Sequence, residues 1–173
     1  MNTFVVEEFV TYRMVTYYTV RWDKSDLSET DKFISKYRNN TKLRRDLDEI
    51  IKLIEDIGRY RGAKDMYFKR HAGAAVELPP LGYFEIDSVE VSYFDNHLRL
   101  FCIKLSENIV ILFNGGEKTS LKTQDSPALS MPFREAQIFV KKILKAKIDD
   151  DIIINHEKHI IESGYGDDPI TIL

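Results

Sequence analysis

Basic side chains near the ends of two predicted strands are the residues best suited to chemistry in this 173-residue chain. Arg99 lies inside the first strand, Lys118 lies just beyond the second, and Lys122 follows four residues later. A turn at Glu107 makes these strands antiparallel neighbours, which pairs Arg99 near residue 115 and brings Arg99 and Lys118 to one edge of the sheet. Cations grouped in this way bind phosphate and stabilise the charge that develops on a transferring phosphoryl group.

The segment before these strands is irregular and rich in further cations. It adds candidate RNA-binding residues, as does the start of the last predicted helix: Arg61, Lys64, Lys69, Arg70, His71 and Arg134. Together with Arg99 and Lys118 they form a group that suits the phosphate backbone of a nucleic acid. A simpler interpretation stays open, in which these are solvated surface cations and Arg99 pairs with Glu85 or Glu90.

Other kinds of chemistry lack the residues that they need. His156 and His159 have no third metal ligand at a diagnostic spacing, and the acidic triplet 149–151 lacks the spacing of a calcium loop. The single cysteine, Cys102, lies in an alternating strand and is expected to be a buried thiol. The segment 114–119 ends in Gly-x-Lys-Thr but lacks the first glycine of a nucleotide-binding loop. We therefore expect no metal and no cofactor.

The charge of the chain is unevenly distributed. The net charge is −3, yet residues 36–147 carry +5 and residues 148–173 carry −6. A basic body with an acidic tail is found in polyanion binders, and it suggests that the tail folds over the basic face and inhibits it. The alternative is that solvated charges are unevenly distributed along the chain by chance, without a function.

The apolar runs and the N-terminus indicate the compartment. No run approaches the roughly 18 apolar residues that a membrane span needs, so no membrane partner is expected. The N-terminus carries Glu7 and Glu8 and no basic cluster, which does not suit a signal peptide. With one cysteine in the chain, we expect a reducing cytoplasm.

Hydrophobic periodicity predicts a mixed architecture. The predicted elements are two strands within 3–22 that separate near Thr11, a helix over Leu27–Tyr37 capped by Ser25 or Ser28, a helix from the N-cap Thr41 to Gly58, a three-stranded antiparallel meander over 83–113, and a helix over Phe133–Lys147. The expected fold is α+β: a small antiparallel β-sheet with an N-terminal helical hairpin packed on one face and a C-terminal helix. We expect one domain over 1–148, with its core at 17–147 and an extra strand at 1–16, followed by an acidic tail at 149–173.

Several segments carry a resemblance to a known family. They are Tyr18–Trp22 with Leu27–Phe33, Leu47–Gly58, Tyr83–Ile86, Leu98–Thr123 and Arg134–Ala136. In this order the chain resembles the RelE/ParE superfamily of bacterial toxins, particularly the branch of HigB and related phage-derived proteins. The resemblance covers about residues 17–147.

The resemblance implies a function and partners. Members related to RelE cut mRNA on the ribosome without a metal, using the RNA's own 2′-OH as the nucleophile, and a small antitoxin blocks them. Carried over to this chain, Arg99, Lys118 and Lys122 are the catalytic candidates. The expected partners are RNA or the ribosome and a cognate antitoxin protein.

Two departures keep other interpretations open. Glu85, Asp87 and Glu90 stand where the nuclease members tend to carry Lys or Arg, and no Tyr or His lies between Lys118 and the last helix. These departures favour a non-catalytic or ParE-like protein-binding module on the same fold. An unrelated α+β interaction domain is a third interpretation.

Overall fold

The computed structural model describes residues 3–70, 75–80, 82–86 and 88–173. The helices are α1 (Glu29–Arg38), α2 (Arg44–Asp56) and α3 (Pro127–Ile148), with short helical turns η1 (Ile57–Arg61), η2 (Asp65–Tyr67) and η3 (Thr123–Asp125). The strands are β1 (Phe4–Thr11), β2 (Thr16–Trp22), β3 (Lys69–Arg70), β4 (Val76–Leu78), β5 (Tyr83–Ile86), β6 (Val89–Ser92), β7 (Leu98–Ser106), β8 (Ile109–Glu117), β9 (Ile152–Asn155), β10 (Ile160–Ser163) and β11 (Ile170–Ile172).

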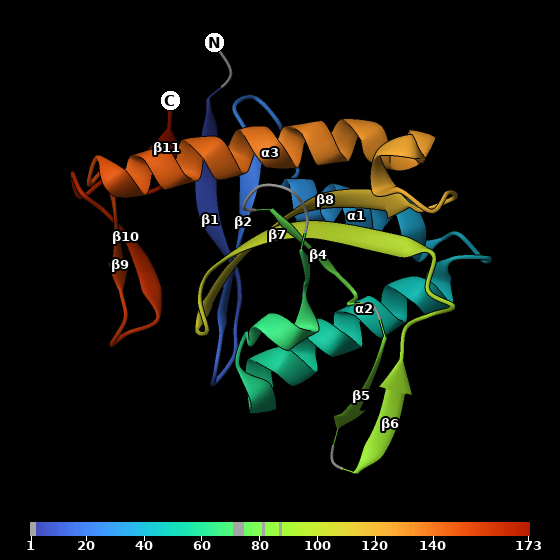
Figure 1. Cartoon of the computed structure of the whole chain (residues 1–173). Helices are drawn as coiled ribbons and strands as arrows, with labels where there is room; N and C mark the ends of the chain where they lie inside the picture. The colour runs from blue at the N-terminus through green and yellow to red at the C-terminus, as the bar shows by residue number, and fades with distance from the viewer. Residues whose placement is uncertain (1–2, 71–74, 81, 87) are drawn as a thin grey trace.

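A seven-stranded sheet organises the molecule, in the order β11-β1-β2-β8-β7-β4-β3 (Figure 1). β2 and β8 run parallel, whereas the other neighbours in this sheet are antiparallel. Apolar side chains of α3 fill a core on one face, and those of α1 and α2 fill a second core on the other. The predicted α+β class is therefore confirmed, but the sheet is larger than predicted and mixed in direction.

The predicted helical hairpin is not evident. α1 packs on β2 and β8, and its first turn meets the end of the parallel ladder, which stops at Thr19 and Leu112. There Thr30 Oγ1 lies 2.7 Å from Thr19 Oγ1 and donates a hydrogen bond to the carbonyl oxygen of Phe113 at 3.0 Å. α2 instead continues into η1. The two helices thus lie on the same face of the sheet, but α1 packs on β2 and β8 whereas α2 packs against η1.

The helix boundaries follow local capping, with two corrections. Ser28 caps α1 as predicted, because its hydroxyl accepts the backbone N–H of Asp31. The prediction of Thr41 as the cap was wrong, because α2 begins at Arg44. The side-chain oxygen of Asn40 accepts hydrogen bonds from the backbone N–H groups of Lys42 and Leu43, just before the helix. Gly58 does not end the helix but lets the Tyr12 ring lie against the backbone, since a Cβ there would sit 2.2 Å from that ring.

The predicted meander over 83–113 was wrong in its first strand. β5 and β6 form a separate two-stranded ribbon, because the chain reverses at Ser88 with a positive φ of 65°. Asp87 lies outside the described residues. β7 and β8 do form the expected hairpin, and the other neighbour of β7 is the short strand β4.

The last part of the chain adds strands to the fold. α3 begins at Pro127, earlier than the predicted Phe133, and residues 149–173 form β9, β10 and β11. β11 pairs with β1 at one edge of the sheet, and the backbone N–H of Ile161 donates to the Tyr18 hydroxyl at 2.9 Å. β3 and β4 lie at the opposite edge (Figure 1). The charge of the tail suggested that it folds over the basic residues, but the tail does not lie over those of β3.

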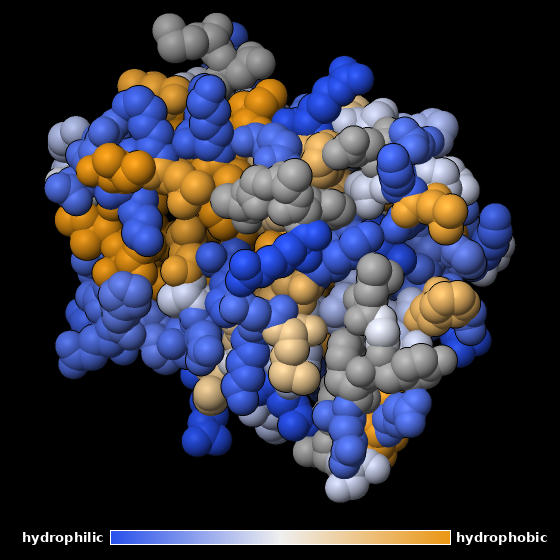
Figure 2. All heavy atoms as spheres, viewed as in Figure 1, coloured by the Kyte–Doolittle hydropathy of each residue, from blue (hydrophilic) through white to orange (hydrophobic). Residues whose placement is uncertain are grey.

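The C-terminal half of α3 carries an apolar surface. Hydrophobic side chains gather over the C-terminal half of α3 and the strands beneath it (Figure 2). Ile138 and Ile148 are among the exposed large apolar residues. None of the described helices combines the length and apolar character that crossing a membrane requires.

Candidate functional site

A cluster of charged side chains lies at the β3–β4–β7 edge of the sheet. Strand pairing aligns Lys69 with Glu77 and Glu77 with Phe101, so that the side chains of Lys69, Glu77 and Phe101 share one face. Arg99 lies two residues before Phe101 and therefore points to the same face, the one that α3 covers. Lys118 directly follows β8, and its backbone N–H donates to the carbonyl oxygen of His97 at 2.6 Å.

Glu77 is the centre of this cluster. Its side chain is fully buried, and its Oε1 lies 3.3 Å from Lys69 Nζ and 3.8 Å from Arg99 Nε. Thr123, in η3, donates its hydroxyl to Glu77 Oε2 at 3.3 Å. A buried carboxylate is tolerated when cations and hydrogen-bond donors surround it in this way.

Arg99 lies below the surface. The side chain is 7% exposed, and Nη1 donates to the carbonyl oxygens of Asn96 and Leu98 at 2.7 and 2.6 Å. Burial lowers the pKa of Arg99, while the nearby carboxylate of Glu77 opposes that shift. Arg99 is thus enclosed by Glu77 and by backbone carbonyls and does not reach solvent. Its charge acts on the neighbouring side chains of the cluster.

Two lysines form the accessible part of the cluster. The Lys69 side chain is 23% exposed, and Lys118 is half-buried. Desolvation lowers the pKa of Lys118 to about 8, helped by the hydrogen-bonded Lys69 side chain and by the charge of Arg99, with Glu77 opposing. An amine with this pKa exchanges its proton near neutral pH, which is the property of a general acid or base.

Two glycines bring η3 and α3 over this cluster. A Cβ at Gly115 would lie 1.8 Å from the carbonyl oxygen of Arg99, and one at Gly116 would lie 2.3 Å from that of Ala128. Only glycine permits β8 to approach β7 and the first turn of α3 so closely. Ser126, the N-cap position of α3, then accepts the backbone N–H of Thr119 at 3.0 Å. This contact holds the loop that carries Lys118.

The structure brings together some of the predicted site residues. Arg99 and Lys118 lie together as their spacing suggested, and Lys69 joins them. The partner of Arg99 is Glu77, not Glu85 or Glu90 as the simpler interpretation had it. Glu77 was not among the residues predicted from the sequence. Its signal was an acidic residue between the apolar Val76 and Leu78, which the following prolines made look like part of a loop.

The other predicted residues have different surroundings. Arg70 is exposed and pairs with Asp65 at 3.2 Å. Arg61 and Lys64 flank a segment bound to the β7–β8 turn, through the backbone N–H of Ala63 and the carbonyl oxygen of Glu107. Lys122, in the loop after β8, and Arg134, on α3, have exposed side chains. His71 lies outside the described residues.

Metal binding has no support among the described residues, where no group of three His, Cys, Asp or Glu side chains is placed to hold an ion. Cys102 is buried as predicted, and burial raises its thiol pKa well above the ordinary value. The chemistry of the cluster is therefore that of amines around a buried carboxylate.

Comparisons with known proteins found no matching family model, curated protein or solved structure.

Proposed function

We propose that this protein is a toxin of the RelE/HigB type, an endoribonuclease that cleaves RNA through the RNA's own 2′-OH without a metal. The observation that carries the proposal is the lysine pair, Lys69 and Lys118, held together over the buried Glu77 and Arg99. Two adjacent amines, of which one titrates near pH 8, meet the main chemical needs of such a reaction.

The reaction requires a proton acceptor and a cation. The 2′-oxygen loses its proton and bonds to phosphorus, while the bond from phosphorus to the 5′-oxygen breaks and the 5′-oxygen takes up a proton from the base that accepted the first one. In this proposal Lys118, in its neutral form, removes the proton, while protonated Lys69 neutralises charge on the phosphate. With a pKa of about 8, roughly a tenth of Lys118 is neutral at pH 7.

The buried residues act indirectly. Arg99 and Glu77 are positioning residues in this proposal, because their side chains are almost wholly enclosed. Glu77 holds Lys69 by its carboxylate, and Arg99 adds a positive charge behind Lys118. Lys122 and Arg134, both exposed, are proposed to contact the RNA backbone farther from the scissile bond.

The toxin role supplies the partners. We propose that a cognate antitoxin protein covers the lysine pair and that RNA, free or on the ribosome, is the substrate in the cytoplasm. The RelE-like arrangement of the fold belongs to the same proposal. Its support is the order of two helices, a strand hairpin carrying Arg99, and a final helix.

A second candidate function is a non-catalytic, protein-binding module on this fold. It is favoured by the enclosure of Arg99, whose guanidinium is hydrogen-bonded to backbone carbonyls and lies beside Glu77. Such an arrangement stabilises a sheet edge without any substrate. This candidate predicts partner capture with no RNA cleavage.

Inducible expression in a bacterial host, with mapping of RNA ends, separates the two. Wild-type protein is expected to arrest growth and create new RNA ends, and Lys118→Gln and Lys69→Gln are each expected to abolish both effects. Lys52→Gln is the matched control, because Lys52 is exposed on α2, which packs on the other face of the sheet. Soluble, folded wild-type protein that produces no new RNA ends would contradict the nuclease.

A further inference from the structure

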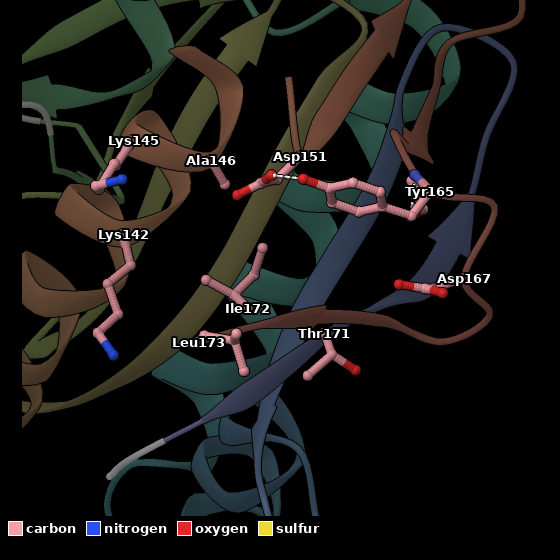
Figure 3. Close-up of a pocket in the computed structure, with 10 residues that line it drawn as sticks. Lys142, Lys145, Ala146, Asp151, Tyr165, Asp167, Thr171, Ile172 and Leu173 are labelled. Atoms are coloured by element: carbon pink, nitrogen blue, oxygen red, sulfur yellow. Dashed lines mark hydrogen bonds between the residues drawn. The ribbon is translucent and has the colours of Figure 1, made fainter. Parts of the chain in front are cut away.

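A hollow lies at the far edge of the sheet from the lysine pair. It has a volume of about 590 Å³ and is bounded by the C-terminal part of α3, the chain around β9 and β10, and β11 (Figure 3). This volume falls within the range of ligand pockets, roughly 300–1,000 Å³. Ala146 and Ile172 are among the apolar residues that line it.

One wall of the hollow is cationic. Lys142 and Lys145 come from the last turns of α3 and lie on the same side of the hollow (Figure 3). Lys145 pairs with Asp149, but this is an exposed pair between residues four apart, whose net stabilisation is small. A phosphate with two negative charges competes well for a lysine held in such a weak pair.

The opposite wall carries an aromatic ring. The Tyr165 hydroxyl donates to Asp151 Oδ1 at 2.7 Å, and this bond fixes the direction of the ring (Figure 3). The residue is nevertheless 75% exposed. A fixed aromatic ring with a free face is the usual platform on which a nucleobase stacks.

We propose that this hollow binds a nucleotide, with its phosphate at Lys142 and Lys145 and its base against the ring of Tyr165. Asp167 lies beyond the ring and is the acceptor available for an amino group on the base (Figure 3). The ligand class is thus a nucleotide whose base carries an exocyclic amino group, either free or as one unit of an RNA chain. This inference goes beyond the proposed nuclease and does not depend on it.

Calorimetric titration of the full chain with AMP tests the proposal. Ribose 5-phosphate lacks the base and adenosine lacks the phosphate, so each is expected to bind at least about tenfold more weakly than AMP. Equal binding of ribose 5-phosphate and AMP would overturn the role of Tyr165. Absence of AMP binding up to about 10 mM would overturn the site, since a phosphate and a stacked base together are expected to do better.

Variants of the two walls test the geometry. Tyr165→Leu is expected to weaken AMP binding at least about fivefold, and Lys142→Gln with Lys145→Gln to weaken it further. The control is Lys141→Gln, which removes a neighbouring exposed lysine of α3 that does not line the hollow. These positions are on the surface, so the variants should keep the wild-type unfolding temperature. AMP binding that neither Tyr165→Leu nor the double lysine variant changes would place the ligand elsewhere and overturn the proposal.

A competition experiment distinguishes a free nucleotide from an RNA chain. If a single-stranded RNA hexamer displaces AMP at a lower concentration than AMP itself requires, and Tyr165→Leu weakens both, the hollow holds a unit of RNA. If AMP binds and the hexamer does not compete, the ligand is a free nucleotide. Lys118→Gln should leave AMP binding unchanged, which separates this proposal from the nuclease.

Discussion

The two edges of the sheet handle charge in opposite ways. At the β3–β4 edge, Glu77 is fully buried and its cations are largely enclosed. At the β11 edge, the pairs that Lys145 and Tyr165 make with aspartates are exposed. Burial strengthens interactions between charges and makes desolvation costly, so only the first edge gains an amine with a strongly shifted pKa. The first edge is therefore equipped for proton transfer and the second for recognition.

Removing a carboxylate at each edge should produce the largest contrast. Glu77→Gln leaves Arg99 and Lys69 without their buried counterion, and we expect a loss of about 3 kcal/mol in the free energy of unfolding. Asp149→Asn removes an exposed partner of Lys145 and should cost only a small fraction of that loss. Urea unfolding of the two variants measures both values. Similar losses of unfolding free energy in the two variants would contradict the proposed difference between the two edges.

The pH dependence of stability sharpens the same contrast. The pKa of Lys118 is lowered to about 8 in the folded protein, against 10.5 in an unfolded chain. Between these two values the unfolded chain binds more protons, so stability rises with pH across this window, and below it the contribution of Lys118 no longer changes with pH. The difference in unfolding free energy between wild type and Lys118→Gln should therefore grow in favour of wild type from about pH 8 to pH 10.

The opposite sign is expected for Lys145 at the second edge. The hydrogen-bonded carboxylate of Asp149 raises the pKa of Lys145, so its pairing stabilises the fold below the unfolded pKa and is lost as pH rises through the folded value. Comparing wild type with Lys145→Gln over the same pH range checks the sign. Because the group is exposed, the effect should be smaller than that of Lys118.

The last prediction concerns the hydrogen bond between the tail and β2. Tyr18→Phe removes the acceptor of the Ile161 backbone N–H, and we expect a loss of about 1 kcal/mol. Amide hydrogen exchange should accelerate at Ile161, whereas the amide of Lys118 at the other edge should keep its protection. Unchanged exchange at Ile161 would show that this bond does not hold the tail.

Local patterns predicted the elements better than their partners. The strands around Arg99, the α1 cap at Ser28 and the buried Cys102 follow from alternation and capping within a few residues. The parallel pairing of β2 with β8 and the addition of β11 depend on contacts between distant segments, which periodicity does not encode. The meander failed for a similar reason, since one reversal at Ser88 detached β5 and β6 from the sheet.

The candidate site was predicted in part. Arg99 and Lys118 were found because a hairpin fixes their relative position. Glu77 was missed because β4 has only three residues and a single acidic residue there resembles a loop. The contact of Lys69 with Lys118 requires β3, β4 and β7 to be aligned, and no pattern in the sequence specifies that alignment.

The protonation of Lys118 is the centre of this account. Carbon-13 NMR titration of the lysine Cε atoms, assigned with Lys118→Gln, measures its pKa directly in wild type and in Lys69→Gln. We expect a value near 8 in wild type, and a clear upward shift in Lys69→Gln, because a neighbouring positive charge is removed. An ordinary lysine pKa in wild type, unchanged by Lys69→Gln, would contradict the proposed site.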